Sequence, residues 1–150
     1  MKRTLIIIFS SVVLVIGVVA FADKTPTREI IFTKNAPAPI GPYSQGIKVG
    51  NTLYVAGQVG FTLEGKLDTS SVENECKQAL NNVKAIVEAS GMTMQQIVKA
   101  TLYVKDLKNF SKINEVYATY FPQNPPARET VQVSALPKSA RFEISVIAVK

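Results

Sequence analysis

The sequence of 150 residues contains no histidine and a single cysteine, Cys76. Without histidine, the chain cannot form a Ser-His-Asp triad, a Cys-His dyad or a metal site with histidine ligands. One cysteine permits neither an internal disulfide nor a cysteine-rich zinc site. Catalysis by this chain therefore has to rely on carboxylates, arginine, lysine, tyrosine, hydroxyl groups or the backbone.

Charge and hydropathy exclude further classes of protein. Lys and Arg number 17 against 11 Asp and Glu, which gives a formal net charge of +6, and hydrophobic residues make up 47% of the chain. This composition excludes a disordered polyelectrolyte and a collagen-like chain. The basic residues are scattered and form no stripe with interleaved aromatic side chains, so we expect no nucleic-acid partner.

Residues 1–22 have the pattern of a secretory signal peptide. Lys2 and Arg3 precede an apolar run from Leu5 to Val19, and the run leads into Ala20-Phe-Ala22. We expect cleavage after Ala22, and hence an exported, periplasmic protein that meets the membrane only through this peptide. An uncleaved membrane anchor and a buried helix are the alternatives, although the run is shorter than the roughly 20 residues that span a bilayer.

Residues 23–150 contain no internal repeat and no dividing linker, so we expect them to form one domain. Their hydrophobic patterns predict strands and two amphipathic helices. The expected strands are 29–33, 45–49, 52–59, 97–104, 127–133 and 141–149. The expected helices are one with an apolar stripe from Val72 to Val87, capped by Ser70-x-x-Glu73 and stopped by Gly91, and one over 110–120.

This order of elements predicts an α+β sandwich, with a mainly antiparallel or mixed sheet and both helices on one face. The other face then needs a cover, and oligomerisation is the usual one, because the final strand is apolar on both faces from Ile144 to Val149. Cys76 lies on the helical stripe, where it is either a small core residue or a reactive thiol.

Three polar residues stand in unusual surroundings. Arg128 opens a strand after Pro-Pro-Ala, Glu143 lies in an apolar final strand, and Tyr43 lies in the loop Gly-Pro-Tyr-Ser-Gln-Gly. One interpretation is a structural ion pair between Arg128 and Glu143 on adjacent strands. The other is a site in which the Arg128 guanidinium binds a small carboxylate and Glu143 supplies the acid or base. Glu129 should point to the opposite face from Arg128, which favours Glu143.

Seven short motifs in order resemble those of the RidA/YjgF family. They are Ile40-Gly-Pro-Tyr-Ser-Gln-Gly46, Val55-Ala-Gly-Gln58, Asn82-Val-Lys-Ala-Ile86, Val104-Lys-Asp-Leu107, Pro126-Ala-Arg128, Leu136-Pro-Lys138 and Phe142-Glu-Ile144. The resemblance covers nearly all of residues 33–150. It implies a chorismate-mutase-like fold and a homotrimer with a cleft at each subunit interface. It also implies a deaminase that hydrolyses 2-aminoacrylate and 2-iminobutyrate types of enamine and imine to 2-keto acids and ammonia, without metal or organic cofactor.

The resemblance also assigns roles to residues. Arg128 is similar to the family's arginine for the substrate carboxylate, and Glu143 to the acid that activates water and passes a proton to the leaving nitrogen. Tyr43 matches the tyrosine that covers the substrate, and Gly57 lies where a backbone group can approach the ligand. Asn114 falls on a family position near the site.

Two residues depart from the family pattern, and these departures leave the substrate preference open. Ala56 stands where many bacterial members have serine, and Thr130 stands where many have cysteine. The location outside the cytoplasm is the larger departure. It favours one alternative function, an envelope protein that binds ligands or acts as a chaperone-like holdase. RNA binding or cleavage is a second alternative.

Overall fold

The computed structural model describes residues 25–150, and the predicted signal peptide lies outside them. One sheet of six strands has the order β1-β2-β3-β6-β4-β5. All neighbouring strands are antiparallel except β4 and β5, which are parallel. The strands are β1 (Arg28–Ile31), β2 (Gly46–Val49), β3 (Thr52–Val59), β4 (Ile97–Val104), β5 (Ala127–Gln132) and β6 (Phe142–Val149).

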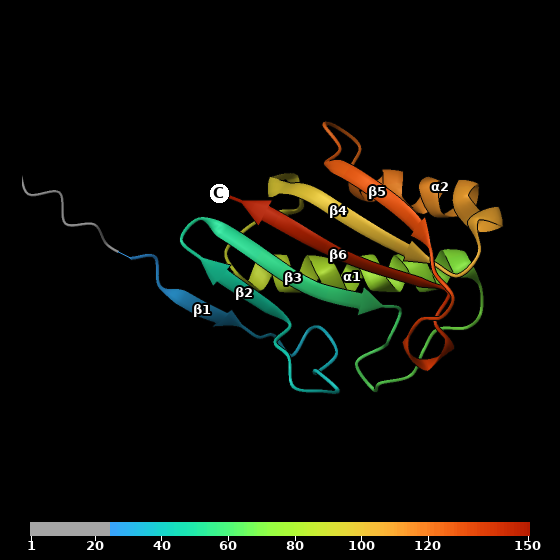
Figure 1. Ribbon diagram of the computed structural model, residues 1–150, viewed down its shortest axis with the longest axis horizontal. Helices are drawn as coiled ribbons and strands as arrows, with labels where there is room; N and C mark the ends of the chain where they lie inside the picture. The colour runs from blue at the N-terminus through green and yellow to red at the C-terminus, as the bar shows by residue number, and fades with distance from the viewer. Residues whose placement is uncertain (1–24) are drawn as a thin grey trace, which may run out of the picture.

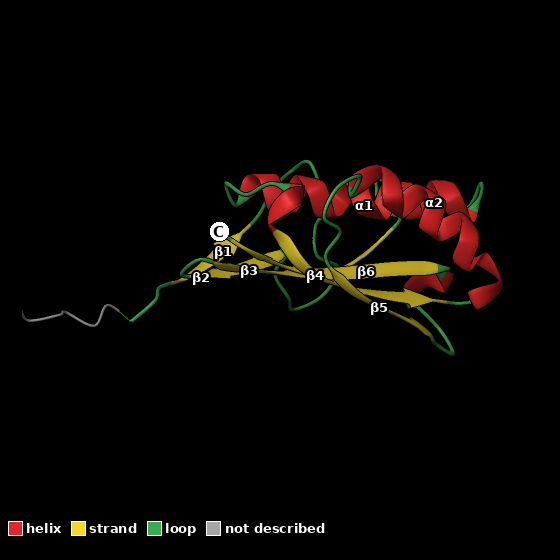
Figure 2. Ribbon diagram, turned by 90° about the horizontal axis from the view of Figure 1, so that it is seen from above, coloured by secondary structure: helices red, strands yellow, loops and turns green. Residues whose placement is uncertain are grey.

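Two helices, α1 (Val72–Ala89) and α2 (Phe110–Tyr120), cover one face of this sheet (Figure 2). The predicted α+β architecture with a mixed sheet and both helices on one face is confirmed. Figure 1 shows that α1 runs behind the central strands, whereas α2 lies toward the end of the molecule that carries β5. Among residues 25–150, no helix is long and apolar enough to cross a membrane.

The start of α1 differs from the prediction. Ser71 is the N-cap, and its hydroxyl accepts a hydrogen bond from the backbone N–H of Asn74 at 3.0 Å. The predicted cap, Ser70, is instead turned back toward the Asp68 carboxylate. Glu73, the other half of the predicted box, forms an ion pair with Lys112 of α2 at 3.0 Å. Competing polar partners on both sides therefore shift the cap by one residue.

The alternating burial along β6 shows which face of the sheet packs against the helices and which face does not. Phe142, Ile144, Val146 and Ala148 are buried against the helices. The alternate residues of β6, beginning with Glu143, face the other way, because successive side chains of a strand point to opposite faces. We call the side without helices the open face.

Cys76 is completely buried under the sheet. Burial raises the pKa of its thiol to about 12, so it stays protonated at neutral pH. This confirms the interpretation of Cys76 as a core residue and excludes a reactive thiol.

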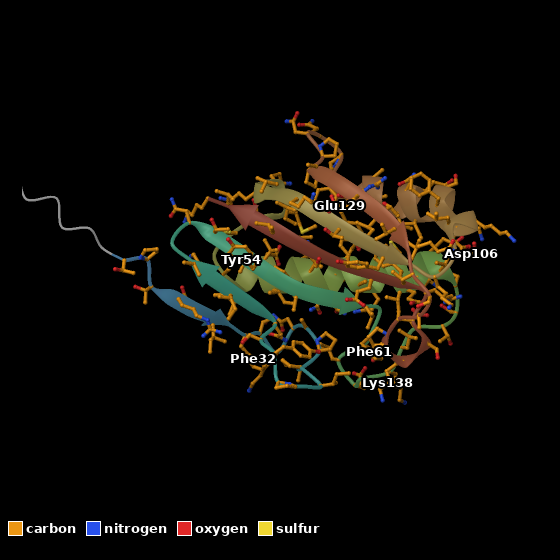
Figure 3. The ribbon with its side chains drawn as sticks, in the orientation of Figure 1. Phe32, Tyr54, Phe61, Asp106, Glu129 and Lys138 are labelled. Carbon is orange, nitrogen blue, oxygen red and sulfur yellow. The ribbon has the colours of Figure 1, made fainter. Side chains whose placement is uncertain are left out.

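The open face carries large apolar side chains that none of the described residues cover. Tyr54 and Val149 are 49% and 41% exposed. Tyr54 and Glu129 are labelled in Figure 3, where this face is turned toward the viewer. An exposed apolar sheet face of this kind is typical of a surface that binds another protein chain.

Candidate active site

A cavity of about 300 Å³ lies where the second half of β3 meets the start of β6 and the loop before β2. Its walls are mainly apolar, and Glu143 is the one carboxylate among the described residues that line it. Phe61, which is labelled in Figure 3, lines the cavity and shows where the cavity lies on the molecule. The lining residues are Pro37, Ala38, Ile40, Tyr43, Gln45, Ala56, Gly57, Gln58, Val59, Phe61, Pro137 and Glu143.

Glu143 is half-buried in this cavity, and burial is the cause that raises the pKa of its carboxyl group. A raised pKa makes the carboxylate a stronger base than an exposed glutamate, which suits a group that has to accept a proton and pass it on. The ion pairs of residues 25–150 do not include Glu143. Its proton affinity is therefore set by desolvation and not by a neighbouring charge.

Gly57 makes room for this carboxylate. A Cβ atom at Gly57 would lie 1.9 Å from Oε1 of Glu143, far inside van der Waals contact. The pairing of β3 with β6 also shifts register between Val55 and Gln58, so Gly57 lies in a bulge. Bulges commonly redirect side chains next to functional sites. Gly57 also lines the cavity, so the close approach of its backbone to a ligand stays a prediction beside this contact with Glu143.

A buried carboxylate on α1, Glu75, fixes the start of β6. It is fully buried and accepts hydrogen bonds from the backbone N–H of Arg141 at 2.6 Å, from Nε of Arg141 at 2.7 Å and from the backbone N–H of Phe142 at 3.1 Å. These donors directly precede Glu143 in the chain. Glu75 was not among the residues predicted from the sequence, although an acid beside Cys76 on an apolar helical stripe is a signal for such an anchor.

Gln45 fixes the loop that carries Tyr43. It is buried, its Oε1 accepts from the backbone N–H of Thr33 at 2.7 Å, and its Nε2 donates to the carbonyl of Pro37 at 2.9 Å. Tyr43 itself is 49% exposed at the mouth of the cavity, and its hydroxyl accepts from the backbone N–H of Ile40 at 3.3 Å. The loop is therefore anchored at its base, whereas its tyrosine remains accessible. Gln45 belongs to the motif Ile40-Gly-Pro-Tyr-Ser-Gln-Gly46, but the motif alone predicted no role for it.

The other predicted residues form a second cluster between α2 and β5. Arg128 lies over the ring of Tyr117, with 4.7 Å from Cζ to the ring centroid. Three buried polar atoms here have no hydrogen-bond partner among residues 25–150, namely Oδ1 of Asn114, the hydroxyl of Tyr117 and Oγ1 of Thr130. Buried polar atoms are nearly always satisfied in folded proteins, so this cluster has the character of a site that awaits a polar ligand.

These two groups of residues do not meet within one chain. Strand β4 separates β5 from β6, and Arg128 pairs with the buried Ala100 whereas Glu143 pairs with Tyr103. Arg128 therefore faces α2, and Glu143 faces the open side. The alternative of a structural ion pair on adjacent strands is wrong, because these strands are not adjacent and the two side chains point to opposite faces. We call the groups the Glu143 half and the Arg128 half.

Glu129 points away from Arg128, as the strand alternation predicted. It forms an ion pair with Lys99, and its Oε1 accepts from the hydroxyl of Thr101 at 3.4 Å. Its carboxylate is thus engaged on the open face, outside the cavity. Among residues 25–150, no group of three or more cysteine or acidic side chains is arranged to hold a metal ion.

These features define a small α+β protein with two separate clusters of candidate site residues, one around Glu143 and one around Arg128. Comparison with known proteins gives the family. The family profile described as Endoribonuclease L-PSP matches residues 33–150. A 2-iminobutanoate/2-iminopropanoate deaminase of Bos taurus is 47% identical over 124 residues, which are 82% of this chain and 90% of that protein.

Solved structures agree with this match. The crystal structure of the YjgF gene product from E. coli is 43% identical, with a TM-score of 0.78 over 81% of this chain and 98% of that chain. The structure of E. coli TdcF with bound serine is 40% identical, with a TM-score of 0.79 over 81% of this chain and 98% of that chain. This chain therefore belongs to the L-PSP family, which is the RidA/YjgF family that the sequence motifs resembled.

Proposed function

We propose that this protein is a deaminase that hydrolyses small imines bearing a carboxylate, of the 2-iminobutanoate and 2-iminopropanoate type, and their enamine tautomers such as 2-aminoacrylate. Relatives at 45–47% identity carry the name of this deaminase. The observation that carries the proposal is the pair of half-sites. One presents a half-buried carboxyl group with a raised pKa, and the other presents an arginine beside three polar atoms that have no partner among the described residues.

The Arg128 half matches the chemistry of an imino acid. The guanidinium donates two parallel hydrogen bonds to the substrate carboxylate. The hydroxyl of Thr130 can donate to the same group, and Oδ1 of Asn114, a buried acceptor, can accept from the substrate N–H. These contacts fix the position of the imine carbon relative to the attacking water, which is where most of the rate gain arises.

The Glu143 half supplies proton transfer. Glu143 takes a proton from water as the water oxygen bonds to the imine carbon, and the C=N bond becomes a C–N bond. The carboxyl group then passes this proton to the nitrogen, which gives the carbinolamine. The Glu143 carboxylate next takes the proton of the new hydroxyl group and transfers it to the nitrogen, so that the C=O bond forms as the C–N bond breaks and the 2-keto acid and ammonia leave. An enamine first takes up a proton on carbon to become the imine. The substrate is electrophilic on arrival, so these residues need no further group for the steps described.

Part of this proposal is that the complete site forms between two chains of a homotrimer. Arg128 and Glu143 face opposite sides of the sheet in one chain. Strand β5 is an edge strand that presents Arg128 beside open backbone groups. The open face carries the apolar side chains that a second chain can bury. Together these features support a site in which one chain supplies Arg128 and a neighbour supplies Glu143.

Mixing two inactive variants tests this arrangement. Arg128→Ala and Glu143→Gln chains would be unfolded together and refolded at equal amounts. Sites between subunits predict that about one quarter of the interfaces receive both native residues, so activity returns. Each variant alone stays inactive, which is the matched control. If the mixture stays as inactive as either variant, the site does not form between chains.

The reaction itself is measured by generating the imine in the cuvette with an amino-acid oxidase and recording release of the keto acid. The protein should accelerate release, and Arg128→Ala should reduce the acceleration by at least roughly 30-fold. A wild-type protein that is as inert as Arg128→Ala would exclude the deaminase function. That result, combined with suppression of aggregation of a client protein, would favour the holdase alternative, since a holdase depends on the exposed apolar face.

RNA cleavage is the weaker alternative, despite the description of the family profile. The described residues that line the cavity include no Lys and no Arg. Recognition of a phosphodiester backbone depends on such cations. A small imino acid, with one carboxylate for Arg128 to bind, matches the two half-sites better.

The proposal includes export to the periplasm, with residues 23–150 as the mature domain. Its support is the sequence pattern alone, namely Lys2-Arg3, the apolar run and Ala20-Phe-Ala22. N-terminal sequencing of the native protein from fractionated cells is the test. A chain that begins at Asp23 in the soluble envelope fraction is expected, and an intact N-terminus in the membrane fraction would establish an anchor instead.

A further inference from the structure

Arg128 is held in an unusual way. None of the ion pairs formed by residues 25–150 includes it. Instead, its Cζ lies 4.7 Å from the ring centroid of Tyr117 and 5.7 Å from that of Phe110, both on α2. These distances are within the range at which the face of an aromatic ring attracts a cation. The guanidinium is thus supported by rings and not by carboxylates.

The ring of Tyr117 is itself fixed in place. Tyr117 is 5% exposed, and its ring packs against that of Phe121 with 4.6 Å between centroids. Phe110, in contrast, is 40% exposed and lies further from the guanidinium. Burial raises the pKa of the Tyr117 phenol to about 12, so the ring stays neutral at physiological pH. Tyr117 is therefore the rigid member of this aromatic pair.

We propose that Tyr117 is a positioning residue for the deamination, which holds the Arg128 guanidinium through its ring face so that the N–H donors remain free for the substrate carboxylate. This inference rests on the proposed function for its consequence in catalysis. Nothing in the family names or in the sequence motifs assigned a role to Tyr117.

The geometry explains why a ring is suited to this task. A carboxylate partner would hold the guanidinium by occupying the same N–H groups that the substrate needs. A ring contacts the flat face of the guanidinium and leaves the donors at its edge unused. Arginine also has a long side chain with much rotamer freedom, and β5 is an edge strand. Without the ring, Arg128 would lose part of its orientation before the substrate arrives.

Two substitutions separate the ring from the hydroxyl. Tyr117→Leu removes the ring, and Tyr117→Phe keeps it. We expect Tyr117→Leu to raise KM for the imine by roughly 2- to 30-fold, the range of cation–π interactions from exposed to desolvated sites. We expect kcat to change less than KM, because the carboxylate is bound in the ground state and in the transition state alike, and only the looser orientation of the imine lowers kcat. Tyr117→Phe should keep the wild-type KM.

Tyr120→Leu is the matched control. Tyr120 lies on the same helix, but its hydroxyl bonds to Oδ1 of Asn81 at 2.7 Å, away from Arg128. It removes an aromatic ring from α2 without touching the guanidinium. A loss of stability common to Tyr117→Leu and Tyr120→Leu, with a raised KM in Tyr117→Leu alone, distinguishes positioning from a general effect on the helix.

Two measurements do not depend on turnover. The Nε–Hε resonance of Arg128, assigned by its loss in Arg128→Lys, should lie upfield of that of the exposed Arg28, because the ring current of Tyr117 shields it. The shift should vanish in Tyr117→Leu and persist in Tyr117→Phe. Titration with pyruvate, a 2-keto acid, should give a Kd raised by the same factor as KM in Tyr117→Leu.

These results decide the proposal in every case. If Arg128 shows no upfield shift in the wild-type protein, the inference is overturned even where Tyr117→Leu fails to fold. It is also overturned if Tyr117→Leu folds and binds pyruvate as the wild-type protein does, or if Tyr117→Phe is as impaired as Tyr117→Leu. If the wild-type protein deaminates no imine, the proposed function fails, while the resonance and the pyruvate titration still decide the role of Tyr117.

Discussion

Replacing Gly57 by alanine tests whether the position of the Glu143 carboxylate matters for catalysis. The added Cβ would lie 1.9 Å from Oε1 of Glu143 and 2.9 Å from its Cδ. Real Cβ atoms essentially never approach another heavy atom within 3.0 Å, so Oε1 has to retreat by at least 3.0 − 1.9, or about 1.1 Å. Gly57 has no positive φ, so alanine itself causes no backbone strain there.

The expected result separates activity from stability. A displacement of about 1 Å at a reacting group costs on the order of 100-fold in rate, so kcat should fall by about that factor. The clashing atoms are the end of a flexible side chain that can swing aside. The free energy of unfolding should therefore fall by only about 1 kcal/mol, the low end of the range for overpacking. Turnover of the oxidase-generated imine and urea denaturation measure the two quantities.

Gly41→Ala is the control for this prediction. Gly41 lies in the loop of Tyr43, and a Cβ there makes only ordinary contacts of 3.5 Å with the Tyr43 ring. It should leave both rate and stability near the wild-type values. In the background of Glu143→Gln, Gly57→Ala should cause no further loss of rate, because the two changes act on one group. A Gly57→Ala protein with the wild-type rate would refute the assignment of Glu143 as the proton-transfer group.

Three further predictions follow from the same contacts. Arg128→Ala should lower kcat/KM by roughly 30-fold to several thousand-fold, the cost of truncating one partner of a buried charge pair; a smaller loss would show that the carboxylate is bound elsewhere. In an Arg128→Ala background, Glu143→Gln should raise Tm at pH 7, because burial raises the pKa of Glu143 and the ionised form is penalised. The difference in Tm between the two proteins should shrink as the pH falls through the pKa of folded-state Glu143 toward the usual carboxyl value. A Tm difference that does not depend on pH would contradict the penalty on ionised Glu143. Glu75→Ala should lower the free energy of unfolding, measured by urea denaturation, by about 3 kcal/mol. This is the low end for a broken buried pair, because the Arg141 side chain is 35% exposed. Glu75→Gln should lower it less, because its amide oxygen can still accept from the backbone N–H groups.

The sequence predicted local structure well because local structure has local causes. Strands β3 and β4 begin and end where the hydrophobic pattern placed them, at Thr52–Val59 and Ile97–Val104. Gly91, with φ of +76°, follows α1 as expected of a residue just past a helix. The cap of α1 was misplaced by one residue, since Asp68 competes for Ser70 through contacts that spacing alone does not reveal.

The relation between Arg128 and Glu143 could not be predicted in this way. Both residues were identified from polar side chains in apolar strands, which is a local signal. Which faces they occupy depends on the strand order β6-β4-β5 and on the pairing of β4 with both neighbours. These are contacts between segments far apart in the chain. The resemblance to a family suggested one shared site, whereas Arg128 and Glu143 lie on opposite faces of the sheet within one chain.

Each half lacks a charged partner that the other half carries. The Glu143 half holds a carboxyl group whose ionisation is penalised by burial, and no described cation offsets that cost. The Arg128 half holds a cation that, within residues 25–150, contacts aromatic rings and no carboxylate, beside polar atoms without partners in the same part of the chain. Bringing a second chain's Arg128 toward Glu143 would lower the pKa of that carboxyl group, and binding of a substrate carboxylate to Arg128 would raise it again. Substrate binding would then itself prepare Glu143 to hold the proton that the leaving nitrogen requires.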